Sequence, residues 1–135
     1  MRSIKVKDYM ADYVLSFKPE TDLFKAIDGM RQRDVSSAPV VDNDGALVGI
    51  LAQWDCLRRM VHGSYFEEAG GPVSDYMQTE LFSISPEDDV LDVAEMMVER
   101  QWHPAIPVLK AGKLVGVLSC SDILQMVRDF ELKRQ

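Results

Sequence analysis

The sequence predicts a mixed α/β (α+β) fold of two β-α-β-β-α repeats that pack through their sheets. Two observations predict it: a repeat at one fixed spacing, and the same order of strand and helix signals in each copy. VKDYM at 6–10 returns as VSDYM at 73–77, and GILAQWD at 49–55 returns as GVLSCSD at 116–122, each 67 residues later. Matches at one offset along the chain indicate an internal duplication.

Each copy opens with a short apolar run that is typical of a strand, YVLSF at 13–17 and LFSI at 81–84. A proline and acidic residues then predict the start of a helix, because Asp22 and Asp89 stand directly before periodic apolar residues. The apolar residues recur at i, i+4 and i+7, which predicts one buried face per helix. The residues of these faces are Leu23, Ile27 and Met30 in the first copy and Val90, Ala94 and Met97 in the second.

Two strands and a tight turn follow in each copy, and a last helix closes it. Asp44-Gly45 at the centre of the first pair and Gly112 in the second are hairpin signals. APVV at 38–41 aligns best with IPVL at 106–109, an offset of 68. The second copy therefore gains a residue before this strand and loses one in the following turn.

The duplication predicts a first repeat at residues 1–62, a Gly- and Pro-containing linker at 63–72 and a second repeat at 73–135. A unit of about sixty residues buries only a marginal core by itself. We therefore expect the two repeats to form one intertwined, compact module.

Composition excludes several classes of function. The net charge of −7 argues against nucleic-acid binding and against an anionic membrane surface, because both need clustered Lys and Arg. No apolar run has the length of a membrane span, and the first residues lack the apolar stretch of a signal peptide. Cys56 and Cys120 have neither metal-ligand nor redox spacing. We expect reduced, partly buried thiols in a cytoplasmic protein, no metal site and, from the initial methionine, a complete short chain.

The order of these features resembles a tandem pair of cystathionine-beta-synthase (CBS) domains, also called a Bateman module. The resemblance rests on the DYM motif, the Ser-x-x-Pro junction, the Pro-Val strand, the hairpin and the Gly-x-x-Ser-x-x-Asp close, in two copies over nearly the whole chain. It implies a pseudo-twofold arrangement with two clefts. Several members of the family bind adenosine-containing ligands in such clefts, and two modules often associate.

The residues of GVLSCSD at 116–122 have two compatible interpretations. In the first, Ser119 or Ser121 caps the following helix and Asp122 stabilises its first turn. In the second, the helix start binds a phosphate, and the ionised Asp122, which only accepts hydrogen bonds, binds the two hydroxyls of a ribose. A nucleoside monophosphate would satisfy both parts of such a site.

The resemblance implies a cleft that borrows from both repeats. Asp122 would hold the ribose, and Ser119 would bond the ribose or the phosphate. Backbone groups of 12–16 and 34–39 would read the edge of the adenine, while three side chains there would either flank the ring or pack in the core. His103 would lie near the phosphate, or would be a surface histidine. The predicted ligand-binding residues are Ser119, Ser121, Asp122, Val14, Ser16, Val35, Ser36, Ser37, Ala38 and His103.

The second cleft departs from the pattern. It would be formed by Asp55, Ala52 and Ser83, with Ala52 in place of the hydroxyl and Trp54 in the position of Ser121. Trp54 either stacks on a base or fills the space. We therefore expect this cleft to be weak or empty.

The leading hypothesis is a regulatory module, not an enzyme, that senses an adenine nucleotide. AMP is the first candidate, followed by ADP, ATP, NAD-type ligands and S-adenosylmethionine, and no other cofactor is expected. We expect a homodimer that reports to an unidentified target protein, with Val61, Ile123, Val127 and Phe130 as its exposed apolar surface. The alternatives are a dimerising scaffold with non-binding clefts and, third, an enzyme.

Overall fold

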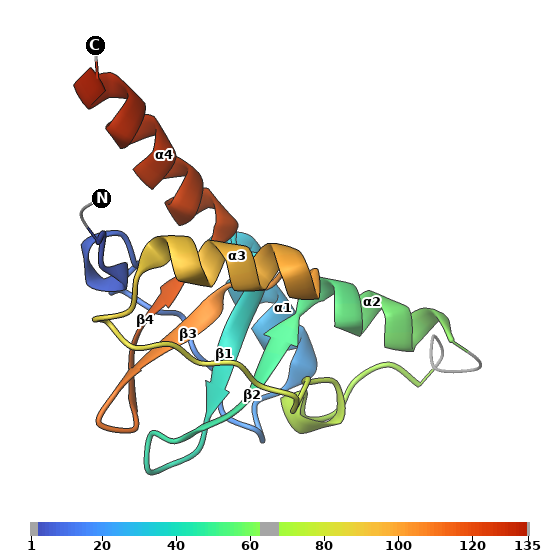
Figure 1. Ribbon diagram of the computed structural model, residues 1–135. Helices are drawn as coiled ribbons and strands as arrows, with labels where there is room; N and C mark the ends of the chain where they lie inside the picture. The colour runs from blue at the N-terminus through green and yellow to red at the C-terminus, as the bar shows by residue number, and fades with distance from the viewer. Residues whose placement is uncertain (1–2, 63–67, 135) are drawn as a thin grey trace. The chain divides into compact units, whose positions relative to one another are not determined.

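The structure is a computed structural model, which describes residues 3–62 and 68–134. It confirms the mixed α/β class, with two antiparallel sheets of two strands each. In chain order the elements are η1 (Val6–Asp8), α1 (Leu23–Gln32), β1 (Ser37–Val41), β2 (Leu47–Ala52), α2 (Gln53–Val61), η2 (Val73–Asp75), α3 (Val90–Arg100), β3 (Ile106–Lys110), β4 (Lys113–Leu118) and α4 (Cys120–Arg134), where η marks a short 3₁₀ helix (Figure 1).

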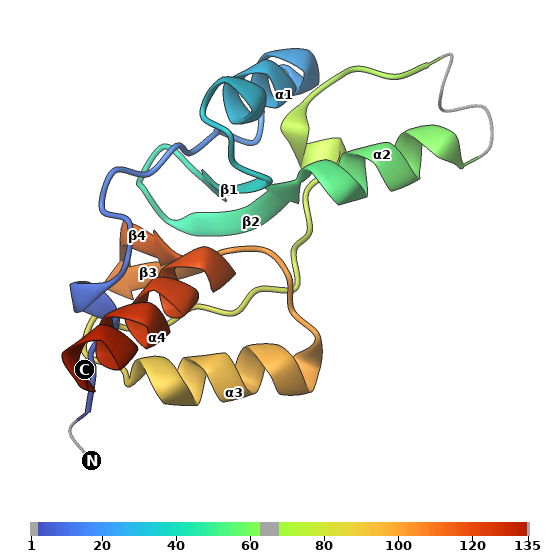
Figure 2. The same cartoon turned by 90° about the horizontal axis from the view of Figure 1, so that it is seen from above.

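The chain divides into two compact units. Met1–Val14 and Phe82–Gln135 form one of them, here called the terminal unit, and Leu15–Leu81 forms the other, the central unit. The terminal unit contains η1, α3, β3, β4 and α4, and the central unit contains α1, β1, β2, α2 and η2. In each unit the second α-helix follows on the second strand of the hairpin, as Figure 2 shows for β2 and α2.

Each repeat begins with a leading segment, which contains the VKDYM motif at 6–10 in the first repeat and the VSDYM motif at 73–77 in the second. The leading segment of each repeat completes the core of the other repeat. Val6 is fully buried in the terminal unit with Val90, and Val73 is fully buried in the central unit with Leu23. The backbone contacts repeat as well. The Val6 N–H donates to the Asp88 carbonyl at 2.9 Å. The Val73 N–H donates to the carbonyl of Thr21, which stands 67 residues before Asp88, at 2.8 Å.

Because of this exchange, the predicted boundaries between the repeats cut through both compact units. Those boundaries stay a prediction about the sequence. Of the expected linker at 63–72, residues 63–67 lie outside the described residues. The carbonyl of Gly71, near its other end, accepts a hydrogen bond from the Leu23 N–H at 2.9 Å, so this part belongs to the central unit.

The predicted first strand of each repeat is wrong as an extended strand. Phe17 pairs with Val40, and Ile84 with Val108, each as one isolated parallel bridge. Prolines explain this, because a proline has no N–H to donate to a ladder. The next hydrogen bond of the Phe17 bridge would need the N–H of Pro19, and the preceding one that of Pro39. Pro86 and Pro107 limit the second bridge in the same way.

Both predicted hairpins are confirmed. Val40 pairs with Gly49 and Val108 with Gly116, and a bulge follows at the same place in each. The first turn contains Gly45 at a φ of 83°, and the second has Ala111 and Gly112 at φ of 52° and 77°, as a two-residue I′ turn requires.

The two predicted helix starts are confirmed, and Asp22 and Asp89 are the N-caps of α1 and α3. A carboxylate oxygen of Asp22 accepts from the Lys25 N–H at 3.2 Å, and one of Asp89 accepts from the Leu91 N–H at 2.9 Å. The buried faces differ slightly from the predicted ones. Ala26 and Val93 are buried in place of Ile27 and Ala94, which pack against the cores and are only partly buried.

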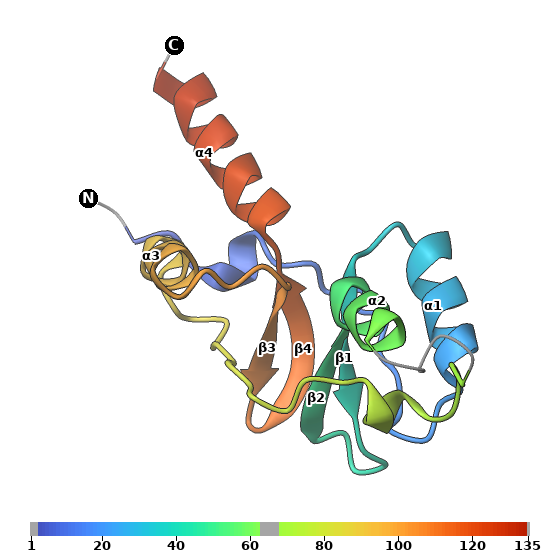
Figure 3. The ribbon, with the colours of Figure 1, turned by 90° about the vertical axis from the view of Figure 1, so that its right-hand side faces the viewer.

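Helix α4 is longer than α2 and is fastened to the leading segment. The Tyr9 hydroxyl donates to Oδ2 of Asp129 at 2.9 Å, and this bond raises the pKa of Tyr9 above its usual 10.0. Figure 3 shows that α4 begins at one end of the β3–β4 hairpin, and that the turn between the two strands lies at the other end. Val127 and Phe130 are exposed on α4, as is Val61 on α2, whereas Ile123 is 9% exposed. The expected exposed surface is therefore wrong for Ile123, which packs in the core of the terminal unit.

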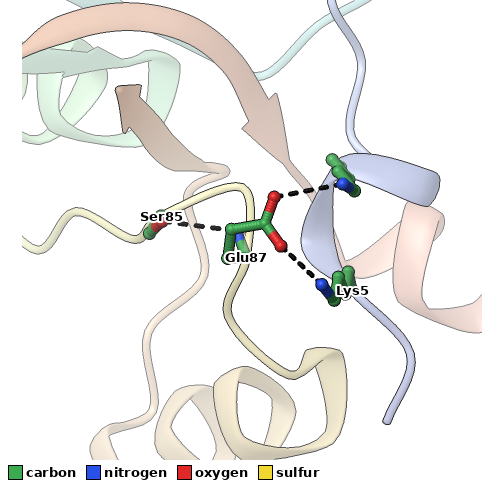
Figure 4. A network of polar contacts seen from close by, with 4 residues as sticks. Lys5, Ser85 and Glu87 are labelled. Atoms are coloured by element: carbon green, nitrogen blue, oxygen red, sulfur yellow. Dashed lines mark hydrogen bonds and ion pairs between the residues drawn. The ribbon is translucent and has the colours of Figure 1, made fainter. Parts of the chain in front are cut away.

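A small ionic cluster joins the leading segment to the loop before α3 (Figure 4). The Glu87 carboxylate accepts from Nζ of Lys5 at 2.6 Å and from Nζ of Lys7 at 3.1 Å, while its N–H donates to Oγ of Ser85 at 3.3 Å. These bonds lower the pKa of Glu87 from 4.5 to about 2, with Lys5 as the main cause. In the central unit the positions of the two lysines are taken by Pro72 and Ser74.

Two sequence expectations concern the thiols and the membrane. Cys56 is buried, which raises its pKa to about 11, but Cys120 is exposed, so the expectation of a partly buried thiol is wrong there. Among the described residues, no helix combines the length and the apolar character that a membrane span needs.

Candidate functional site

The turn between β4 and α4 is a reciprocal capping box. The Ser119 N–H donates to Oδ2 of Asp122 at 2.9 Å, and the Asp122 N–H donates to Oγ of Ser119 at 3.1 Å. Such a pair satisfies two backbone donors at a helix start and fixes both side chains. The capping interpretation of this motif is therefore confirmed.

The capping box leaves several polar groups for a ligand. In the part of the chain that the structure describes, no hydrogen bond reaches Oδ1 of Asp122. The Ser119 hydroxyl accepts one bond and retains its own O–H as a donor. The N–H groups of Cys120 and Ser121, at the start of α4, have no intrahelical acceptor. One carboxylate oxygen, one hydroxyl and the positive end of a helix dipole thus lie within a single turn.

His103 lines the same hollow as the start of α4, within the terminal unit. This hollow has a volume of about 470 Å³ and lies along the end of α3 and the beginning of α4. Its walls are mostly apolar and include Met97, Val98, Trp102, His103, Cys120 and Leu124. His103 is exposed, so its imidazole is accessible at this end of the unit.

In the central unit, the segment before β1 exposes two residues whose backbone carbonyls accept hydrogen bonds from Gln53. Val35 and Ser36 are exposed, and their carbonyls accept hydrogen bonds from Gln53, one from its side-chain amide and one from its N–H, both at 2.9 Å. Ala38 is 2% exposed and packs in the core of the central unit. Its side chain therefore takes the packing alternative, and its backbone lies in the β1–β2 ladder opposite Leu51.

Gln53 is not among the site residues that the sequence pattern predicts. Its partner Val35 lies 18 residues earlier in the chain. No local pattern connects the two positions. The only signal is that the equivalent residue of the second repeat is Cys120, whose side chain cannot make the same bond.

The predicted second site has a different local structure. Ala52 is the N-cap of α2 and makes no side-chain cap, and Oδ1 of Asp55 lies 3.5 Å from a guanidinium nitrogen of Arg58. Trp54 is 69% exposed and lines a smaller hollow of about 250 Å³ on α2, together with Val61. Asp55 therefore has a cationic neighbour, whereas among the described residues the Asp122 carboxylate accepts its one hydrogen bond from the Ser119 N–H.

The predicted residues divide between the two compact units. The terminal unit contains Ser119, Ser121, Asp122, His103, Val14 and Ser83, and the central unit contains Ser16, Val35, Ser36, Ser37, Ala38, Ala52 and Asp55.

Comparison with known proteins decides the family. The sequence profile described as "CBS domain" matches the chain twice, at residues 6–62 and 73–129. The chain belongs to the CBS domain family. The predicted tandem CBS pair is therefore confirmed, and the matches cover most of the chain.

Two curated relatives are similar to most of the chain. The chain is 32% identical over 119 residues to the CBS domain-containing protein YhcV of Bacillus subtilis, covering 87% of this chain and 81% of YhcV. It is 33% identical over 112 residues to an inosine-5′-monophosphate dehydrogenase of Aquifex aeolicus, covering 82% of this chain and 22% of that enzyme. The chain spans less than half the length of the first two curated relatives that it matches.

A solved structure shows the same fold with a ligand. CBSX2 of Arabidopsis thaliana, in complex with AMP, superposes with a TM-score of 0.81 at 23% identity, covering 94% of this chain and 98% of CBSX2. The CBS-pair fold is thus shown for this chain. Among the described residues, no group of His, Cys, Asp and Glu has the arrangement of a metal site.

Proposed function

We propose that the chain is a regulatory CBS pair that binds one adenine nucleotide, with AMP as the first candidate. The observation that carries the proposal is the turn at Ser119–Asp122, where Oδ1 of Asp122 and the Ser119 hydroxyl remain available beside a helix start. The AMP complex of CBSX2 supports the ligand class, because CBSX2 has the same fold.

Each group of this turn suits one part of the nucleotide. Asp122 would accept hydrogen bonds from the ribose hydroxyls, since an ionised carboxylate is an acceptor only. The Ser119 hydroxyl would donate to the ribose or the phosphate. The phosphate would lie at the start of α4 near Ser121, where the helix dipole favours an anion. His103 would approach it from the hollow that it lines together with Cys120, the first residue of α4.

The base would be read by backbone groups of the Val35–Ala38 segment, with Val14, Ser16, Ser36 and Ser37 beside it. Support comes from the exposure of Val35 and Ser36 and from the family resemblance.

The output would be a shift between conformations. A ligand can move such an equilibrium only by its difference in affinity for the two states. The chain would pass this change to a target protein, either directly or through the geometry of a homodimer.

Titration with a panel of AMP, ADP, ATP, NAD and S-adenosylmethionine, followed by calorimetry, tests the proposal. We expect saturable binding of at least one adenine nucleotide and weaker binding of its 2′-deoxy form. Absence of binding across the panel would leave the scaffold function in its place.

That scaffold is a second candidate, which a separate observation favours. Large apolar side chains are exposed along α2 and α4, namely Trp54, Leu57 and Val61 on α2 and Leu124, Val127, Phe130 and Leu132 on α4. A twofold homodimer would bury such surfaces. Sedimentation at micromolar concentration, with and without nucleotide, should give the mass of two chains, and a mass of one chain in both conditions would refute the dimer.

A further inference from the structure

Three large apolar side chains form one exposed face of α2. Trp54 is 69% exposed, Leu57 is 54% exposed and Val61 is 63% exposed. They stand at i, i+3 and i+7, so they lie along one side of the helix. A contiguous apolar face marks a contact with another molecule, and tryptophan is among the side chains that contribute most to such contacts.

The terminal unit has a concave apolar surface, the hollow of about 470 Å³ between the end of α3 and the beginning of α4. Two of its lining residues are strongly exposed, Val98 of α3 at 79% and Leu124 of α4 at 61%. A concave surface with apolar walls accepts an apolar group. The α2 face thus offers a large projecting side chain, and the terminal unit offers a hollow.

The charges that border the two surfaces have opposite signs. On α2, Arg58 stands four residues after Trp54 and three before Val61, so it borders the apolar face. On α3, Glu95 stands three residues before Val98, so it borders the hollow. Both charged side chains are exposed. Complementary charges of this kind favour one pairing of surfaces over others.

We infer that Trp54 of one chain inserts into the α3–α4 hollow of a second copy, and that Arg58 then lies beside the partner's Glu95. This inference rests on the homodimer proposed above and deepens it, because it names the surfaces that pair. In a twofold dimer the pairing occurs twice.

The neighbouring charged groups agree with this pairing. Asp55 lies 3.5 Å from Arg58, but its side chain is 18% exposed against 49% for Arg58, so the cation dominates the exposed surface. On α3, the guanidinium of Arg100 lies 4.4 Å from the centre of the Phe82 ring. Glu99, four residues after Glu95, adds a second exposed acid to the same helix.

The same charges disfavour a dimer in which equal surfaces pair. Such a dimer would bring Arg58 close to the partner's Arg58, or Glu95 close to the partner's Glu95. Like charges that face each other across an interface weaken it. It would also leave the hollow without the tryptophan that fits it.

Sedimentation equilibrium of the whole chain tests the pairing through the dissociation constant of the dimer. We expect Trp54→Ala to weaken the dimer about thirtyfold, which corresponds to a loss of about 2 kcal/mol. Arg58→Glu and Glu95→Arg should each weaken it about tenfold, and the variant with both substitutions should return close to the wild type. Lys110→Glu, a charge reversal at an exposed position at the end of β3, is the control and should keep the wild-type affinity.

Cys120 reports on the hollow itself, because this exposed thiol lines it. Alkylation by iodoacetamide should be slower in the dimeric wild type than in Trp54→Ala, where the hollow is open to the reagent. Cys56 is the internal control, since it is buried and its pKa is raised to about 11.

The other outcomes overturn the inference. An unchanged dimer in Trp54→Ala, or equal alkylation of Cys120 in both proteins, would show that Trp54 does not occupy the hollow. Single charge reversals without effect, or a double variant that does not recover, would show that Arg58 and Glu95 do not face each other. A wild type that stays monomeric would refute the homodimer as well, whereas a dimer that every variant retains would refute this pairing alone.

Discussion

The starts of α4 and α2 occupy equivalent positions of the duplicated sequence, yet they bind different groups. At α4, Ser119 and Asp122 bind each other's backbone N–H, and Oδ1 of Asp122 remains available. At α2, Ala52 supplies no cap and Asp55 lies beside Arg58. The backbone of the repeat is thus retained, while a few side chains distinguish the proposed nucleotide site at α4 from a turn without a side-chain cap at α2.

The largest expected effect compares the two aspartates. Asp122→Ala should weaken AMP by about 1.5–3 kcal/mol, the range for hydrogen bonds to charged groups, because the ribose hydroxyls lose their acceptor. Asp55→Ala should change the affinity little, since Asp55 has Arg58 as its neighbour. Calorimetry of both variants measures this difference. Asp122→Asn controls for the charge, and a larger loss in Asp55→Ala would mean that the two sites are assigned in the wrong order.

The two hairpin glycines provide the next comparison. A Cβ on Gly116 would lie 2.7 Å from the Ala11 carbonyl oxygen, whereas one on Gly49 would lie 2.6 Å from Sδ of Met77, a flexible side chain. Overpacking costs about 1–3 kcal/mol, so we expect Gly116→Ala near the upper end and Gly49→Ala near the lower end. Urea unfolding measures the loss of stability in both variants. Equal losses would contradict the difference between the backbone contact at Gly116 and the side-chain contact at Gly49.

Exchanging the cap residues tests the capping box itself. Ser119→Ala should lower the free energy of unfolding by about 1 kcal/mol, because the Asp122 N–H loses its acceptor. Ala52→Ser should raise it by a smaller amount, about 0.5 kcal/mol, by supplying a cap to α2. Thermal unfolding of the two variants measures both changes. An unchanged stability in Ser119→Ala would argue that the box contributes nothing.

The smallest effect concerns Glu87 and pH. Its pKa is about 2 in the folded chain and 4.5 as its ordinary value, so its ion pairs stabilise the fold fully above pH 4.5. This stabilisation is lost as the pH falls from 4.5 toward 2, because the carboxylate then binds a proton. The partners are half-exposed, so salt should weaken the effect.

Acid titration of stability in Glu87→Gln measures this contribution. The variant should lose part of the pH dependence between 4.5 and 2. Glu20→Gln, at the equivalent position of the first repeat, is the control and should keep the wild-type dependence. The same curve in all three proteins would contradict the role of the cluster.

Local signals predicted much of this structure, and contacts distant in sequence set the remainder. Asp22 and Asp89 were predictable caps because a cap acts within three residues. The short parallel bridges were also predictable in principle, since Pro19 and Pro39 remove the flanking donors. Val6 and Val73 begin the same motif in the two copies. Because the motif is the same, it did not indicate that each valine completes the core of the other repeat.

The candidate site also combines contacts that are local in sequence with contacts that are distant. The Ser119–Asp122 turn is local, and its cap could be predicted from four residues. The contact of Gln53 with Val35 joins a helix start to a loop 18 residues away, and no pattern predicts it. Ala38 shows the opposite case, because its position in a strand also suits the core, where the structure places it.

The stoichiometry of AMP binding, measured by calorimetry on the whole chain, tests the central claim most directly. The difference between the two helix starts predicts one AMP per chain, bound at Ser119 and Asp122, with the same stoichiometry in Asp55→Ala. Two AMP molecules per chain, or one that persists in Asp122→Ala and disappears in Asp55→Ala, would contradict it.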